Sequence, residues 1–124
     1  MVSLLRAPVL LAGLLALVLG LGACAAEESE IQRLMEGHAT VVDVRSPEEY
    51  AAGHVEGALN IDLAADDFRE RVDELPRDTY YVVYCASGSR ASRAVAVMRS
   101  LDFGSVVNGG GYDALAELGV RTTR

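Results

Sequence analysis

Residues 80–90 read YYVVYCASGSR, a sequence that indicates a β-strand, a tight loop and the start of a helix. The run at 80–84 consists of Tyr and Val, which favour strands, and it is the strongest strand signal in the chain. Cys85 follows directly, then small residues and Arg90, and residues 92–101 carry apolar side chains at helical spacing. In open parallel sheets, ligands bind beyond the carboxyl ends of the strands. The loop at 85–90 is therefore the candidate functional segment.

The alternation of strands and helices continues on both sides of this stretch. Ser46, Pro47 and Glu49 form the pattern of a helix N-terminus with a capping box. The pattern predicts strands at 40–44, 58–61 and 105–107, and helices at 27–38, 46–53, 66–75, 92–101 and 112–118. Gly109 to Gly111 are expected to form a turn. Since the strands are apolar without period-two alternation, the predicted fold is α/β, a single domain with a parallel β-sheet and helices on both faces.

The residue types at 85–90 suit a reactive thiol. Small side chains and Gly88 let the backbone curl so that N–H groups point inward, and a helix N-terminus adds a favourable field for negative charge. Such a field lowers the pKa of Cys85 and makes its thiolate a competent nucleophile. Arg90 adds a permanently charged, forked donor for an anion. The alternative is a structural Cys85, a small residue that packs at a strand end.

A second stretch of sequence resembles a known family. Residues 43–61, DVRSPEEYAAGHVEGALNI, are similar to the rhodanese signature: Asp-Val-Arg, a Glu-Tyr pair, then Gly-His-aliphatic-any-Gly-Ala-any-Asn. Together with the Cys85 loop and residues 109–112, the resemblance covers residues 31–120. The chain looks most like the single-domain periplasmic rhodaneses of the phage-shock type.

The resemblance implies a sulfurtransferase that needs no cofactor. Cys85 would take a sulfane sulfur from a donor such as thiosulfate, become a persulfide, and pass the sulfur to cyanide or a thiol. The residues expected to bind the donor and stabilise the persulfide are Ala86, Ser87, Gly88, Ser89, Arg90 and Arg45. The six-residue loop matches the sulfur-handling members of the family, whereas phosphatase and arsenate-reductase relatives have one residue more. An alternative function is a sulfur carrier or sensing module that holds the persulfide for a partner.

Several positions qualify this expectation. Ala86 stands where many thiosulfate-active members carry a cation, which leaves Arg90 to hold an anionic donor, with help from Arg45 or Arg93. Asp43 and Arg45 are expected to form a structural ion pair near the loop, since buried charges are usually paired. His54 is expected to serve as a structural hydrogen-bonding residue. Leu115 replaces a Trp that many members carry after the late glycines.

The N-terminal sequence predicts that the protein is exported from the cytoplasm. Residues 7–26 hold no charged side chain, and residues 1–23 have the layout of a signal peptide. The sequence LGAC, ending at Cys24, resembles a bacterial lipobox, which implies that Cys24 is lipidated, becomes the mature N-terminus and anchors the domain outside the cytoplasm. An uncleaved membrane span and release as a free periplasmic or secreted protein are the alternatives. Residues 24–30 would then be a linker or the start of the first helix, and residues 31–124 the rhodanese-like domain.

The net charge and the numbers of cysteines and histidines limit the classes of binding partner that we expect. The formal net charge is −7, and an acidic domain repels the phosphates of nucleic acid. Two cysteines cannot build a disulfide scaffold, and two histidines without a second usable cysteine make a metal site unexpected. We expect a monomer whose partners are a small sulfur-containing anion, a thiol acceptor and a membrane reached through Cys24.

Overall fold

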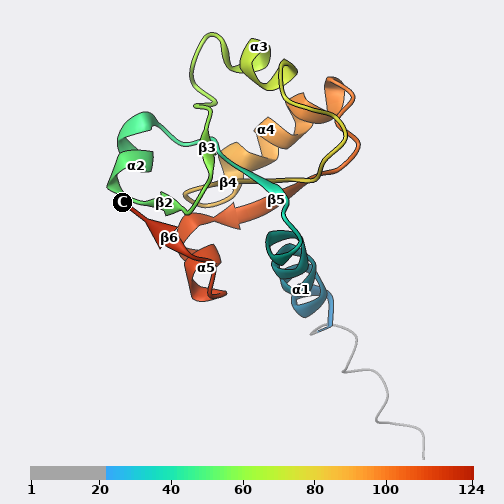
Figure 1. Ribbon diagram of the computed structural model, residues 1–124, viewed down its shortest axis with the longest axis vertical. Helices are drawn as coiled ribbons and strands as arrows, with labels where there is room; N and C mark the ends of the chain where they lie inside the picture. Colours follow the sequence, from blue (N-terminus) through green and yellow to red (C-terminus); the bar gives the residue numbers. More distant parts are fainter. Residues whose placement is uncertain (1–21) are drawn as a thin grey trace, which may run out of the picture.

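The computed structural model describes residues 22–124, with side chains described from Glu28 onward (Figure 1). Its elements are α1 (Gly22–Glu36), β1 (Thr40–Asp43), α2 (Pro47–Ala52), β2 (His54–Val55), β3 (Leu59–Asn60), α3 (Phe68–Asp73), β4 (Tyr81–Cys85), α4 (Ser89–Ser100), β5 (Val106–Gly111), α5 (Tyr112–Glu117) and β6 (Thr122–Thr123). The predicted signal peptide lies outside these residues up to position 21. Cys24 lies in α1, and its side chain is outside the description. From residue 22 onward, no helix has the length and apolar character needed to cross a membrane.

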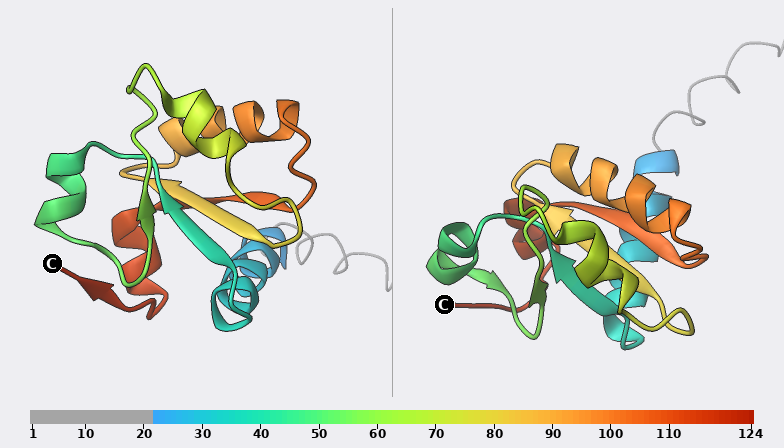
Figure 2. Two further views of the ribbon diagram at one scale, coloured as in Figure 1. Left: turned by 45° about the horizontal axis from the view of Figure 1, so that its top comes forward. Right: turned by 90° about the horizontal axis from the view of Figure 1, so that it is seen from above.

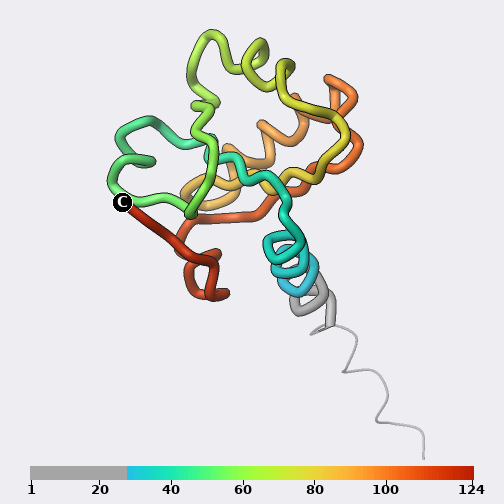
Figure 3. Tube along the Cα trace, viewed as in Figure 1, coloured from blue at the N-terminus to red at the C-terminus, as the bar shows by residue number. Residues whose placement is uncertain are grey.

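The main sheet has four strands in the order β3-β1-β4-β5, and every pairing is parallel. The predicted α/β fold with a parallel sheet is therefore confirmed. Because β4 pairs with a strand on each side, its last residue, Cys85, lies at the carboxyl edge of the sheet between its neighbours. A second, antiparallel pair joins β2 to β6, so the end of the chain returns to β2 (Figure 3). These two-residue strands were not predicted.

Each face of the sheet buries its own apolar cluster. Helices α3 and α4 lie over one face, and α1 and α5 over the other (Figure 2). Side chains of β4 alternate between the faces: Tyr81, Val83 and Cys85 pack with α3 and α4, whereas Tyr84 packs with the second cluster. This alternation places the Cys85 thiol on the side of the sheet from which α4 begins.

Two predicted boundaries differ in ways that matter for the site. Helix α4 begins at Ser89, not at residue 92, so Arg90 belongs to its first turn. The glycines at 109–111 do not form a turn but the end of strand β5. A Cβ on Gly109 would lie 2.6 Å from Val82 Cγ1, and one on Gly111 would lie 2.5 Å from the Ala86 carbonyl oxygen. Gly109 and Gly111 are therefore needed at these positions, because β4 and the residue after Cys85 lie too close to the backbone of β5 to leave room for a side chain.

The predicted start of α2 is confirmed. The Ser46 hydroxyl accepts a hydrogen bond from the Glu49 amide at 3.2 Å, and the Glu49 carboxylate accepts one from the Ser46 amide at 2.9 Å. This reciprocal capping box satisfies two amides at the helix start. It also fixes the direction in which the Glu49 carboxylate points.

Candidate active site

Cys85 ends β4, and the chain turns sharply before α4 begins at Ser89. The turn depends on Gly88, whose φ of 94° lies in the left-handed region that disfavours side chains. A Cβ there would also lie 3.3 Å from Gly110 Cα, since β5 passes directly beside the loop. Asn108 of β5 fixes this arrangement, because its side-chain amide donates to the Gly88 carbonyl at 3.0 Å and its side-chain oxygen accepts from the Gly110 amide at 2.8 Å.

The Cys85 sulfur faces the amides of this turn. Gly88 N–H donates to Sγ at 3.0 Å, and Ala91 N–H donates at 3.4 Å. The thiol is fully buried, and burial alone would raise its pKa. The N–H groups of Ala91, Ser87, Gly88 and Arg90 favour the thiolate and more than offset burial, so the pKa of Cys85 is lower than ordinary. Cys85 is therefore a buried thiol whose surrounding amides favour its more nucleophilic form, the thiolate.

One amide that acts on Cys85 Sγ was not among the predicted residues. Ser87, Gly88 and Arg90 supply amides as expected, and Ala91 supplies a further one, while the roles of Ala86 and Ser89 stay predictions. The early start of α4 explains Ala91, since it turns that amide back toward the strand end. The side chains of Ala86, Ser87 and Ser89 are exposed, and their contact with a donor stays a prediction.

Arg90 is held by a residue from another part of the chain. Its guanidinium donates to both carboxylate oxygens of Glu49, at 2.8 and 2.9 Å. The hydrogen bonds from Arg90 and from the Ser46 amide lower the pKa of Glu49 to about 2, so the carboxylate is ionised at neutral pH. Sequence reasoning assigned Arg90 to an anionic donor and gave Glu49 only its role in the helix cap. The structure shows that both terminal nitrogens of the Arg90 guanidinium already donate to the Glu49 carboxylate.

Asp43 and Arg45 form the expected buried ion pair. Arg45 donates to both Asp43 oxygens, with the shortest contact at 2.7 Å, and to the Gly53 carbonyl at 2.7 Å. Its guanidinium also lies over the Tyr112 ring, 4.6 Å from the centroid. Arg45 is 6% exposed, and its predicted contact with the donor stays a prediction.

Tyr84 extends this network from the strand that ends in Cys85. Its hydroxyl donates to Asp43 at 2.6 Å and accepts from the Val55 amide at 2.9 Å. Burial raises the pKa of Tyr84, and the hydrogen bond to Asp43 raises it further, so the hydroxyl stays protonated. Asn60 adds hydrogen bonds to the carbonyls of Asp43 and Arg45 at 3.1 and 2.9 Å. The network therefore ties β1, β2 and β3 to β4 immediately beside the site.

His54 has the position of a structural residue. Its Nδ1 lies 2.8 Å from the Tyr50 carbonyl oxygen, and its ring stacks on the Tyr50 ring with centroids 3.6 Å apart. The Tyr50 hydroxyl in turn donates to the Ala58 carbonyl at 2.7 Å. These contacts connect α2 to the segment before β3, in agreement with the hydrogen-bonding role expected for His54.

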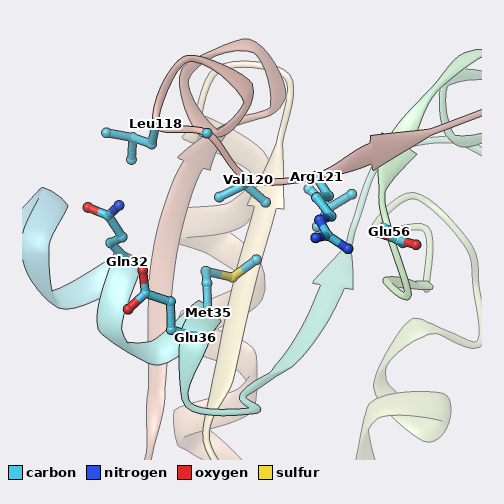
Figure 4. Close-up of a pocket in the computed structure, with 9 residues that line it drawn as sticks. Gln32, Met35, Glu36, Glu56, Leu118, Val120 and Arg121 are labelled. Carbon is cyan, nitrogen blue, oxygen red and sulfur yellow. The ribbon is translucent and has the colours of Figure 1, made fainter.

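A cavity of about 300 Å³ lies elsewhere, between α1 and the segment that follows α5 (Figure 4). Its lining residues are Gln32, Met35, Glu36, Val55, Glu56, Leu118, Gly119, Val120 and Arg121. The Cys85 loop contributes none of them. Within the described part of the chain, His, Cys, Asp and Glu side chains form no group of three that could hold a metal ion.

Comparisons with known proteins agree with this geometry. The family model described as Rhodanese-like domain matches residues 27–117. A sulfurtransferase from Allochromatium vinosum is 36% identical over 95 residues, covering 75% of this chain and 87% of that protein. Thiosulfate sulfurtransferase PspE from Escherichia coli is 34% identical over 77 residues, covering 60% and 72%. Two further relatives are longer proteins, of which the chain spans 39% and 57%.

A solved structure shows the same fold. The crystal structure of a rhodanese-related protein from Thermoplasma volcanium has a TM-score of 0.66 at 30% identity, covering 77% of this chain and 93% of that one. The named relatives support a sulfurtransferase-type role. With a family match that spans most of the described domain and a neighbour of the same architecture, the chain belongs to the Rhodanese-like domain family.

Proposed function

We propose that the protein is a sulfurtransferase that moves a sulfane sulfur from a donor such as thiosulfate to cyanide or a thiol through a persulfide on Cys85. The observation that carries the proposal is the position of Cys85 Sγ, which accepts hydrogen bonds from the backbone N–H groups of Gly88 at 3.0 Å and Ala91 at 3.4 Å. These amides favour a negative charge on Sγ, which is the state of the thiolate before transfer. In the persulfide the charge lies on the terminal sulfur, and the N–H groups of the same loop would stabilise it there.

The proposed reaction has two steps. The Cys85 thiolate attacks the outer sulfur of thiosulfate, the S–S bond of the donor breaks, and sulfite leaves with the bonding electron pair. Cyanide then attacks the terminal sulfur of the persulfide, thiocyanate leaves, and the thiolate is restored. Atoms and charges balance in each step without a further oxidant or reductant.

Intact-mass analysis of the full chain after incubation with thiosulfate tests the first step. We expect a gain of about 32 Da, one sulfur atom, that is absent in Cys85→Ser and retained in Cys24→Ser. The Cys24 variant is the matched control, because it removes the other cysteine of the chain. If neither thiosulfate nor any organic sulfane donor adds a sulfur to Cys85, the proposal is wrong.

The second candidate is a sulfur carrier that keeps its persulfide for a partner. The full burial of Cys85 favours a carrier. A sulfur with no exposed surface is hard for a small thiophile in solution to reach, so it would be retained. Cyanide-dependent turnover separates the two functions. An enzyme produces many thiocyanate molecules per chain, whereas a carrier yields no more than one and then stops.

We further propose that Cys24 is the lipidated N-terminus of an envelope-anchored protein, with a free periplasmic or secreted form as the alternative. The leader sequence supports this, and cleavage before Cys24 would remove only the first two residues of α1. The test is the mature protein recovered from bacterial membranes. Its mass should match a diacylated chain that starts at Cys24, and Cys24→Ala should abolish the modification. A membrane-bound chain that keeps residues 1–23 would overturn the proposal.

A further inference from the structure

The Glu49–Arg90 ion pair lies where the Cys85 loop joins helix α4. Arg90 supplies one of the amides that act on the Cys85 sulfur, and its side chain reaches Glu49 from the first turn of α4. Both side chains are partly accessible, 31% exposed for Arg90 and 38% for Glu49. At the helix end of the Cys85 loop, the pair therefore presents to solvent one positive and one negative charge that cancel.

Negative groups besides Glu49 act on Arg90. Hydrogen bonding to Glu49 raises the pKa of Arg90, and the charges of Glu49, Cys85 and Asp62 raise it further. Ala86, the residue after the nucleophile, is neutral. A donor with two negative charges thus finds no uncompensated positive charge on Arg90, the one cation of the loop at 85–90, and no cation at position 86.

We infer that Glu49 is a specificity-determining residue, which neutralises Arg90 and thereby favours singly charged sulfane donors over the thiosulfate dianion. The inference rests on the proposed sulfurtransferase function and assigns the class of its donor. Organic thiosulfonates, which carry one negative charge, belong to this class. The Cys85 thiolate takes their outer sulfur, and a sulfinate leaves with the bonding electron pair, so the chemistry matches that of thiosulfate with one charge fewer.

The capping box makes Glu49→Gln a mild replacement. A Gln side chain can still accept from the Ser46 amide, because the capping-box position takes either Glu or Gln. Removing the carboxylate charge leaves Arg90 with a net positive charge at the loop. One unit charge at a partly exposed site should favour the dianion over the monoanion by about three- to tenfold.

The experiment compares loading rates of Cys85 by thiosulfate and by methanethiosulfonate, each followed by intact mass on the full chain. Comparing the two rates as a ratio cancels any change in Cys85 nucleophilicity, which affects both donors. We expect Glu49→Gln to raise the ratio of thiosulfate to thiosulfonate rate about three- to tenfold, and added salt to reduce that gain. Glu49→Asp, which keeps the charge, should leave the ratio near that of the unmodified protein.

Ser46→Ala is the matched control. It removes the hydroxyl that accepts from the Glu49 amide at 3.2 Å but keeps the carboxylate and Arg90. It should lower stability without changing the donor ratio.

If both donors load Cys85 and Glu49→Gln leaves the ratio unchanged, the role of Glu49 is refuted and the proposed function stands. If Ser46→Ala shifts the ratio as much as Glu49→Gln, the effect is structural and the inference is also wrong. If neither donor loads the unmodified protein, both proposals fail.

Discussion

Gly88→Ala should separate the electrostatic role of the loop from its role in folding. An alanine at φ 94° is strained by about 1–2 kcal/mol, and its Cβ would lie 3.3 Å from Gly110 Cα. Relief of that strain must move the Gly88 amide, which now donates to Cys85 Sγ at 3.0 Å. A hydrogen bond to a charged group contributes about 1.5–3 kcal/mol, and one pKa unit corresponds to about 1.4 kcal/mol. Because the Ala91 amide remains, we expect the pKa of Cys85 to rise by about one unit.

The assay is the ultraviolet absorbance of the thiolate during a pH titration, with Cys85→Ser subtracted to remove the tyrosine signal. Gly104→Ala is the control, because a Cβ at Gly104 meets nothing within 4 Å. It should leave both the pKa and the stability unchanged. If Gly88→Ala lowers stability while the pKa of Cys85 stays constant, the Gly88 amide does not stabilise the thiolate, and the electrostatic reasoning for the loop is refuted.

Three further changes test the surrounding structure. Tyr84→Phe removes a hydroxyl that bridges Asp43 and the Val55 amide, and urea denaturation should show a loss of about 1–3 kcal/mol; an unchanged midpoint would contradict a stabilising network. Gly111→Ala places a Cβ 2.5 Å from the Ala86 carbonyl oxygen and should cost about 1–3 kcal/mol in the same measurement, whereas a neutral effect would mean that β5 can move away from the loop. Glu49 has its pKa lowered to about 2 in the folded protein, so its contribution to stability is complete above its ordinary value near 4.5 and is lost as pH falls toward 2. Glu49→Gln should therefore weaken the dependence of the free energy of unfolding on pH between about 4.5 and 2. The change should be less than about 1 kcal/mol because the pair is partly exposed, and an unchanged pH dependence in this range would argue against the pairing.

Local signals in the sequence were sufficient for the framework of the site. The Tyr and Val run of β4 and the small residues after it predict a strand and a curled loop, because these preferences act over neighbouring residues. The capping box of α2 is confirmed for the same reason, since Ser46 and Glu49 are three positions apart. The start of α4 was placed too late because Ser89 and Arg90 resemble loop residues when read without their helical hydrogen bonds.

Contacts between distant segments could not be predicted. Glu49 and Arg90 are separated by 41 positions, and nothing in either local sequence indicates that one will meet the other. Asn108 likewise gives no signal of its bond to the Gly88 carbonyl, because that bond depends on β5 lying beside β4. The glycines at 109–111 were misassigned to a turn, since glycine marks both turns and close backbone approach, and only the packing distinguishes the two.

The pairing of β2 with β6 has a practical consequence for shortened versions of the protein. The family match ends at residue 117, yet Thr122 and Thr123 lie against Val55 and His54, and the Arg121 carbonyl accepts the Glu56 amide at 2.9 Å. Truncation at residue 117 would leave the backbone of β2 without these bonds, as an unpaired edge that invites association between molecules. A recombinant domain trimmed to the family boundary should therefore aggregate more readily than the longer one, and purification tags are better separated from residue 124 by a spacer.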